Sequence, residues 1–257
     1  MIPTMAELSA RGETPEVLFW VGCAGSFDDR AKRIIKAFAH LLQKAGVHFA
    51  VLGTEESCTG DPAKRAGNEF LFQMQVMTNI KVLNSYHITK IVTACPHCFN
   101  TLKNEYPALG GHYEVLHHTE LLKALVQEGR LTIEDGAFKG KRIVFHDPCY
   151  LGRANKVYNA PRELLQKLDA DLVEMKSCKV RALCCGAGGA QMFKEAEKGD
   201  KDINVLRTEQ ALEVHPNIIA TACPFCNTMM TDGIKTKNKE TQVKVYDIAE
   251  LLDNSEK

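Results

Sequence analysis

The chain of 257 residues has neither a net charge nor a long apolar run. Its 32 basic residues balance its 32 acidic ones, so no broad electrostatic attraction draws it to nucleic acid or anionic lipid. The longest apolar stretches, such as 17–22 and 218–223, fall far short of the roughly 20 residues that span a bilayer. The N-terminal sequence MIPTMAELSARGETPE lacks the apolar segment of a secretory signal. We therefore expect a cytoplasmic protein that binds no nucleic acid and does not itself span a membrane.

Cysteine, by contrast, is abundant, with ten residues in a chain of otherwise ordinary globular composition. In a reducing compartment, so many cysteines indicate metal or redox chemistry rather than structural disulfides. Their arrangement along the chain therefore decides how they are interpreted.

The chain repeats itself, which is best tested before any other pattern is read. Four landmarks recur in the same order at offsets of 126 to 130 positions. They are FWVGC and FHDPC ending at Cys23 and Cys149, SCTG and LCCG around Cys58 and Cys184, TACPHCFNTL and TACPFCNTMM, and EVLHHTELL and KVYDIAELL. The sequence therefore predicts two related halves, at 13–130 and 140–252, with tails at 1–12 and 253–257.

Each half alternates short apolar runs with helical stretches. Apolar runs without a polar alternation, separated by helices, are typical of a parallel sheet that is covered on both faces. We expect strands at 17–23, 47–53, 90–95 and 113–117, then at 142–149, 171–176, 217–223 and 243–247, with helices at 28–45, 61–86, from 96, and at 119–128 in the first half. The predicted fold class is α/β, a tandem pseudo-symmetric duplication of a small, mostly parallel sheet flanked by helices.

Nine of the ten cysteines belong to the repeat, and Cys178 is the exception. In open parallel sheets, ligands gather at the carboxyl ends of the strands, where several of these cysteines fall. The first half contributes Cys23, Cys58, Cys95 and Cys98, and the second contributes Cys149, Cys184, Cys185, Cys223 and Cys226.

Thiolates converging from distant segments suit an iron–sulfur cluster, because iron is satisfied by soft sulfur donors. Zinc is the main alternative for the first half, since four donors complete its tetrahedral site. The second half has five cysteines, two of them adjacent, which exceeds what tetrahedral zinc uses. A thioredoxin-like dithiol would leave Cys23, Cys149 and the duplication unexplained.

The spacing C-x(~35)-CCG-x(~37)-CxxC resembles the CCG, or cysteine-rich, domain family. That family includes the cluster-bearing component of heterodisulfide reductase and the iron–sulfur components of glycolate oxidase and lactate-utilisation systems. It also includes iron–sulfur oxidoreductases that pass electrons from electron-transferring flavoprotein to quinone, and the run ESCTGDPAKRAGNEF is most similar to these. The resemblance implies that Cys149, Cys184, Cys185, Cys223 and Cys226 bind an iron–sulfur cluster. It implies a [4Fe–4S] cluster in the second half, of cubane or non-cubane type.

The first half departs from the family pattern, since Thr59 replaces the second cysteine of the CCG motif. Its four remaining cysteines favour a conventional [4Fe–4S] cube, with an empty or zinc-filled site as the alternatives.

The resemblance further implies an electron-transfer subunit of an oxidoreductase, relaying electrons between a flavoprotein and a quinone-linked acceptor. Family members commonly carry a ferredoxin-like segment or membrane helices that this sequence lacks. We therefore expect a ferredoxin-like or membrane-anchored iron–sulfur partner, a flavoprotein partner, and a peripheral place at the inner face of the membrane through such a partner. The alternative function is a heterodisulfide or disulfide reductase that acts at a non-cubane cluster. A role for His146 in tuning the cluster, for Cys178, and for Lys179, Arg153 and Arg181 in offsetting its charge is left open.

Overall fold

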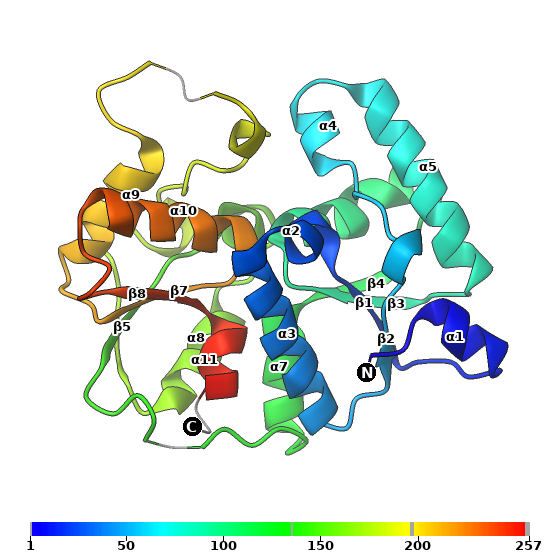
Figure 1. Cartoon of the computed structure of the whole chain (residues 1–257), viewed down its shortest axis with the longest axis horizontal. Coiled ribbons are helices and arrows are strands. Elements are labelled where there is room, and N and C mark those ends of the chain that lie inside the picture. Colours follow the sequence, from blue (N-terminus) through cyan, green and yellow to red (C-terminus); the bar gives the residue numbers. More distant parts are fainter. Residues whose placement is uncertain (1, 135, 196–197, 255–257) are drawn as a thin grey trace.

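The computed structural model describes residues 2–134, 136–195 and 198–254. It contains two four-stranded sheets, one in each half, lying side by side with helices around them (Figure 1). The strand orders are β2-β1-β3-β4 and β6-β5-β7-β8, and every pairing is parallel. The strands are β1 (Val17–Trp20), β2 (Phe49–Ala50), β3 (Lys90–Thr93), β4 (Glu114–His117), β5 (Arg142–Phe145), β6 (Asp171–Val173), β7 (Ile218–Thr221) and β8 (Lys244–Asp247). The predicted α/β duplication is confirmed.

Helices connect the strands and cover the sheets (Figure 1). They are α1 (Met5–Ala10), α2 (Gly22–Phe27), α3 (Asp29–Lys44), α4 (Asp61–Arg65), α5 (Glu69–Ser85), α6 (Pro96–Asn100), α7 (His118–Gln127), α8 (Asn159–Leu165), α9 (Ile203–Leu212), α10 (Pro224–Thr236) and α11 (Ile248–Asn254). Among the described residues, no helix is both long and apolar enough to cross a membrane.

The strands are short, and the central strands β1, β3, β5 and β7 are mostly buried on both faces, as the apolar runs predicted. Every residue of β1 and β7 is buried. Helix α3 begins at a side-chain cap, because Asp28 accepts a hydrogen bond from the Ala31 amide at 2.8 Å. Apolar residues at helical spacing, including Ile34, Phe38 and Leu42, then face the core.

The single helix predicted over 61–86 is wrong, because the structure breaks it into α4 and α5. Gly67 between them has φ +86°, a left-handed conformation that ends a helix. The side chain of Asn68 then accepts from the Leu71 amide at 3.0 Å and caps the start of α5.

The predicted N-terminal tail at 1–12 is corrected by helix α1. Thr4 and Glu7 form a capping box, and Met5 and Leu8 are buried against the first half. Two apolar side chains three residues apart lie on one helix face, so even this short segment can contribute to the core. Residue 1 and residues 255–257 of the predicted tails lie outside the described residues, whereas 253–254 complete α11.

The two halves share one core rather than standing apart. Helix α11 packs against α3 of the first half, and α7 packs against α8 of the second. Across the junction, the buried His118 donates to Asp247 (Nε2–Oδ1 2.9 Å), and Arg30 binds both carboxylate oxygens of Glu250. The boundaries 13–130 and 140–252 remain a prediction about the units of the repeat.

Candidate metal centres

The cysteines of the repeat lie beyond the carboxyl ends of the strands in each sheet. In the first half, Cys23, Cys58 and Cys95 follow β1, β2 and β3, which are neighbours in the sheet order. In the second half, Cys149 and Cys223 follow β5 and β7. Because the strand order reverses between β2 and β3 on either side of β1, the chain leaves a crevice there in which a ligand can be held.

In the second half, five sulfur atoms gather within one pocket. The Sγ atoms of Cys149 and Cys184 are 3.9 Å apart, and those of Cys185 and Cys226 are 3.3 Å apart. Cys223 is packed with the latter pair in one buried cluster. Cys149 therefore lies well within reach of the adjacent pair at 184 and 185.

The pKa values of these thiols are strongly shifted, because the thiols lie close together and are largely buried. The pKa of Cys184 lies far below its usual range, first because of its side-chain hydrogen bond with Cys149. The pKa of Cys185 is raised to about 12, first by its bond to Cys184. Burial raises the pKa of Cys223 well above its usual range. Five thiolates cannot all be charged here without a cation among them, so the donor set fits a bound metal.

In the first half, four cysteines and a glycine form the matching pocket. The thiol of Cys23 donates to Cys58, which raises the pKa of Cys23 and lowers the pKa of Cys58 to about 7. Cys98 shares a proton with Cys95, and the pKa of Cys98 is raised by this bond. Gly22, at φ +78°, lies so near that an added Cβ would be 3.4 Å from the Cys98 sulfur.

The turns at Cys58 and Cys184 have the same conformation. Gly60 and Gly186 both have φ +92°, which L-residues with a side chain rarely adopt. Each glycine amide donates to the cysteine two residues earlier, at 3.5 Å to Cys58 and 3.3 Å to Cys184. The two motifs are thus structurally equivalent, residue for residue.

This equivalence places Thr59 where the second half has Cys185. The hydroxyl of Thr59 donates toward Cys98 at 3.8 Å, whereas Cys185 contacts Cys226, the counterpart of Cys98. Both residues therefore contact the second cysteine of their own CxxC motif. The first pocket has a hydroxyl where the second has a fifth thiol.

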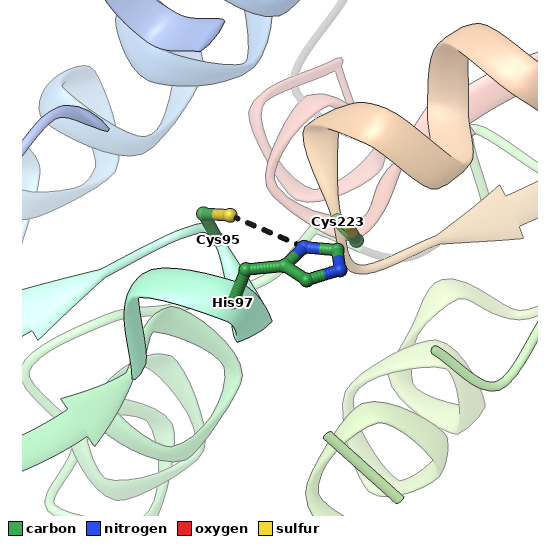
Figure 2. Close-up of side chains that lie close together, drawn as sticks. All are labelled: Cys95, His97 and Cys223. Carbon is green, nitrogen blue, oxygen red and sulfur yellow. Dashed lines mark hydrogen bonds between the residues drawn. The ribbon is translucent and has the colours of Figure 1, made fainter. Parts of the chain in front are cut away.

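The two pockets meet at Cys95 and Cys223 (Figure 2). The sulfur atoms of these cysteines and a ring nitrogen of His97 all lie within 4.8 Å of one another. The rings of His97 and Phe225 pack with centroids 5.5 Å apart. Cys95 with Cys223, and His97 with Phe225, are repeat counterparts, so the axis relating the halves passes between the two CxxC turns.

His97 is buried and does not face solvent. Its Nδ1 lies 3.8 Å from the Cys95 sulfur, and its ring packs against that of Tyr150, with centroids 4.7 Å apart and the planes tilted by 46°. Because Phe225 occupies the equivalent place in the other half, His97 is not part of the repeated donor set.

The comparison with known families gives the same pattern. The cysteine-rich domain called CCG matches residues 17–103 and again residues 143–231. The chain belongs to the CCG family. Both matched segments run from the first strand of a half through its CxxC motif.

Relatives of this CCG protein carry iron–sulfur and oxidoreductase names. It is 49% identical over 99% of its length to "Probable iron-sulfur-binding oxidoreductase FadF" of Bacillus subtilis, and 47% identical over 94% to "EtfAB:quinone oxidoreductase" of Syntrophomonas wolfei. It is 33% identical over 92% to a component of the dihydromethanophenazine:CoB–CoM heterodisulfide reductase of Methanosarcina barkeri. The chain spans 36%, 34% and 58% of these proteins, respectively.

Cys178 is not part of the buried cysteine cluster of the second half or of the candidate metal-binding groups among the described residues. The charged groups that act on its thiol are Glu174, Arg162 and Asp147, and burial raises its pKa. Lys179 and Arg181, next to it, are exposed to solvent. The CCG protein thus leaves these two cations, considered from the sequence as counter-charges, at its surface.

Sequence reasoning missed Arg207, a fully buried arginine of α9 beside the second pocket. It donates from Nε to Nδ1 of His146 at 3.0 Å. The available signal was helical spacing, because Arg207 shares the buried face of α9 with Thr208 and Ala211.

The loop that carries Cys149 is fixed by a buried ion pair. Arg162 binds both oxygens of Asp147, at 2.8 and 2.9 Å, and also reaches Glu174. Replacing Arg162 with methionine leaves Asp147 buried without its partner, which is expected to lower the free energy of unfolding by about 3–5 kcal/mol. Chemical denaturation measures this change.

The matched control for Arg162 is Arg142, whose pair with Asp171 is exposed. Arg142→Met is expected to change the free energy of unfolding by only about 0–1 kcal/mol. Equal effects of the two variants would contradict the structural importance of the pair at Asp147.

Proposed function

We propose that this CCG protein is an iron–sulfur electron-transfer subunit of an oxidoreductase, relaying electrons between a flavoprotein donor and a quinone-linked acceptor. The single observation that carries the proposal is the contact between the two thiol pockets at Cys95 and Cys223. Iron–sulfur clusters exchange single electrons at potentials set by charge, hydrogen bonds and burial. Two adjacent sites suit transfer from one to the other within the chain.

The proposed ligands are the nine cysteines of the repeat. Cys23, Cys58, Cys95 and Cys98 would hold a [4Fe–4S] cluster in the first half. The second half would hold a [4Fe–4S] cluster, of cubane or non-cubane type, through Cys149, Cys184, Cys185, Cys223 and Cys226. The presence of soft sulfur donors alone in each set favours iron–sulfur chemistry over harder metals.

The relatives support the proposed partners. One is named for EtfAB and quinone, and another, 39% identical over 99% of this chain, is named "Probable membrane-anchored ferredoxin". We infer a flavoprotein of the EtfAB kind as the electron donor and a ferredoxin-like, membrane-anchored iron–sulfur module as the neighbour. This module would place the protein at the membrane surface.

The second candidate function is reduction of a disulfide at the cluster of the second half. The cavity beside Ala187 and Gly188 of the CCG loop has only about 10 Å³, room for about one water molecule. A larger groove of about 350 Å³ lies instead over Cys23 and the apolar side chains of Phe27, Phe193 and Phe225. Of these two cavities, the one large enough for a disulfide substrate is lined by Cys23 of the first pocket, which lacks the fifth thiol. This geometry favours relay.

Anaerobic purification with iron and sulfide analysis tests the cofactor. We expect about eight irons and eight acid-labile sulfides per chain, with no stoichiometric zinc. Zinc without sulfide would end the iron–sulfur proposal.

A separate experiment tests the relay. The protein as purified is mixed with a reduced EtfAB-type flavoprotein, and cluster reduction is followed by loss of visible absorbance. We expect reduction by the flavoprotein and no oxidation of the reduced protein by small aliphatic disulfides. Rapid oxidation by a disulfide, with release of two thiols, would favour the reductase instead.

A further inference from the structure

Arg207 is fully buried, yet no carboxylate of the described residues lies within 4.0 Å of it. Its guanidinium donates to Nδ1 of His146 at 3.0 Å, to the Ser177 carbonyl at 2.8 Å and to Gln210 Oε1 at 2.9 Å. Its Nη2 has no hydrogen-bond acceptor in the part of the chain that the structure describes. A buried charge is costly unless an opposite charge balances it.

Arg162, the other buried arginine among the described residues, shows how a buried positive charge is usually balanced in this protein. Arg162 is also buried, but it contacts two carboxylates, those of Asp147 and Glu174. Arg207 has only neutral acceptors. The negative groups that act on Arg207 are first the Asp147 carboxylate and then the thiols of Cys178, Cys226 and Cys185. Asp147 already binds Arg162 through both of its oxygens, so it does not by itself balance a second arginine.

The sulfur atoms of the second pocket supply further negative charge beside Arg207. A ring nitrogen of His146, the partner of Arg207, lies within 4.8 Å of the Sγ atoms of Cys185 and Cys226, all three of them buried. Arginine can only donate hydrogen bonds, so Nδ1 of His146 must be an acceptor. The proton of the neutral ring is then on Nε2, which has no acceptor among the described residues. Nε2 of His146 and Nη2 of Arg207 are thus both hydrogen-bond donors without an acceptor among the described residues, and His146 lies beside the thiols of the second pocket.

His146 is therefore not suited to bind iron. One of its ring nitrogens is occupied by Arg207, and the other carries the proton. The ring instead orients the guanidinium and offers an N–H of its own.

In the first half, the positions equivalent to His146 and Arg207 hold no cationic side chain. The repeat places Trp20 at the position of His146, since each lies three residues before the first cysteine of its half. It places Asn79 at the position of Arg207, at the same offset of 128 that relates Cys95 to Cys223. Asn79 is neutral and donates to the Cys58 carbonyl at 2.9 Å and to the Tyr106 hydroxyl at 3.0 Å.

The two halves also differ by one thiol, because Thr59 stands where the second half has Cys185. The half with five cysteines thus has the buried cation, and the half with four has a neutral side chain in its place. Relative to the first half, the second half gains one negative charge if Cys185 is a thiolate and one positive charge from Arg207, and these two charges cancel.

We propose that Arg207, oriented by His146, is the built-in counter-charge for the fifth thiolate, Cys185, and that the pair donates hydrogen bonds to sulfur of the second centre. This inference rests on the proposed function, in that the second centre must hold a cluster. Because reduction adds negative charge, the cation stabilises the reduced centre and raises its reduction potential.

The primary test is the variant Arg207→Met, which removes the charge and keeps an unbranched side chain. Redox titration monitored by paramagnetic resonance should show the second centre becoming harder to reduce. We expect the ratio of reduced to oxidised centre at a fixed potential to fall about tenfold, which is about 59 mV for a one-electron couple. Arg207→Lys should restore most of the difference, and Arg181→Met, which removes an exposed charge, should have no effect.

A double-mutant cycle tests the pairing with Cys185. Cys185→Thr introduces the residue that the first half itself uses. In that background, Arg207→Met should shift the potential of the second centre far less than in the native protein, or not at all. An equal shift in both backgrounds would contradict the pairing.

Two further outcomes separate this inference from the function on which it rests. If native protein contains no iron and sulfide, the proposed function fails. If both clusters are present in Arg207→Met and the second keeps its native potential, the function stands and the counter-charge is refuted.

Two measurements on His146 keep the inference testable if Arg207→Met does not fold. Glutamine can accept from Arg207 and donate to sulfur, so His146→Gln should keep the native potential, whereas His146→Leu should lower it. Equal potentials in these two variants would contradict the orienting role of the ring. Protein labelled with ¹⁵N-histidine gives a further test by electron paramagnetic resonance. Strong coupling of a histidine nitrogen to the second centre would overturn the proposal, since it would make His146 a ligand of that centre.

Discussion

Replacing Cys184 with alanine is expected to abolish the cluster of the second half and leave that of the first intact. The Cys184 sulfur lies 3.9 Å from Cys149 and accepts the Gly186 amide, so it is central to the second pocket. Alanine supplies no soft donor at that turn. Iron and sulfide should fall by about half, and one of two paramagnetic signals should disappear.

Two variants control this experiment. Cys178→Ala removes the cysteine that lies outside both pockets, and it should leave the iron content and both signals unchanged. Cys58→Ala removes the structural equivalent of Cys184 and should abolish the other signal. Loss of both signals in Cys184→Ala, with the protein still folded, would show that the two pockets do not hold separate centres.

The variant Thr59→Cys is expected to convert the first centre into one that resembles the second. The Thr59 hydroxyl already lies 3.8 Å from the Cys98 sulfur, and the glycine after it has the same φ as the glycine after Cys185. A thiol at this place completes the CCG motif of the first half. The resonance and Mössbauer spectra of the first centre should change to the type of the second.

The new centre should also be harder to reduce than the second one. Asn79, which takes the position of Arg207, provides no positive charge to offset the added thiolate. Thr59→Val is the matched control, because it removes the hydroxyl without adding a thiol. If Thr59→Cys and Thr59→Val have the same spectra, the added sulfur does not reach the first centre.

Much of the fold was accessible from local patterns. The eight strands coincide with short apolar runs, because strands buried on both faces need no polar alternation. The predicted helix over 61–86 and the predicted N-terminal tail were wrong, because the local sequence signals there were weak or pointed to more than one structure. Gly67 and Asn68 end one helix and begin another within an otherwise helical stretch. Met5 and Leu8 give too short a pattern to predict a helix that joins the core.

The candidate sites divide in the same way. The repeat identified nine cysteines and the substitution of Thr59, since both are properties of the order of residues. Helical spacing placed Arg207 with Thr208 and Ala211, but it could not show that this side chain lies beside the second pocket, because an arginine in a helix is usually exposed. Only the packing of α9 in the second half buries this side chain beside His146.

The sequence alone determined the duplication, the parallel strands and which cysteines belong to each half. These features follow from hydrophobic periodicity and from repeated motifs, which can be read without knowing any distant contact. Only the tertiary structure decided that the two CxxC turns face each other at Cys95 and Cys223, and that a buried cation stands beside the pocket with five thiols. These facts depend on how segments far apart in the chain pack together. Local patterns along the sequence do not show which distant segments come into contact.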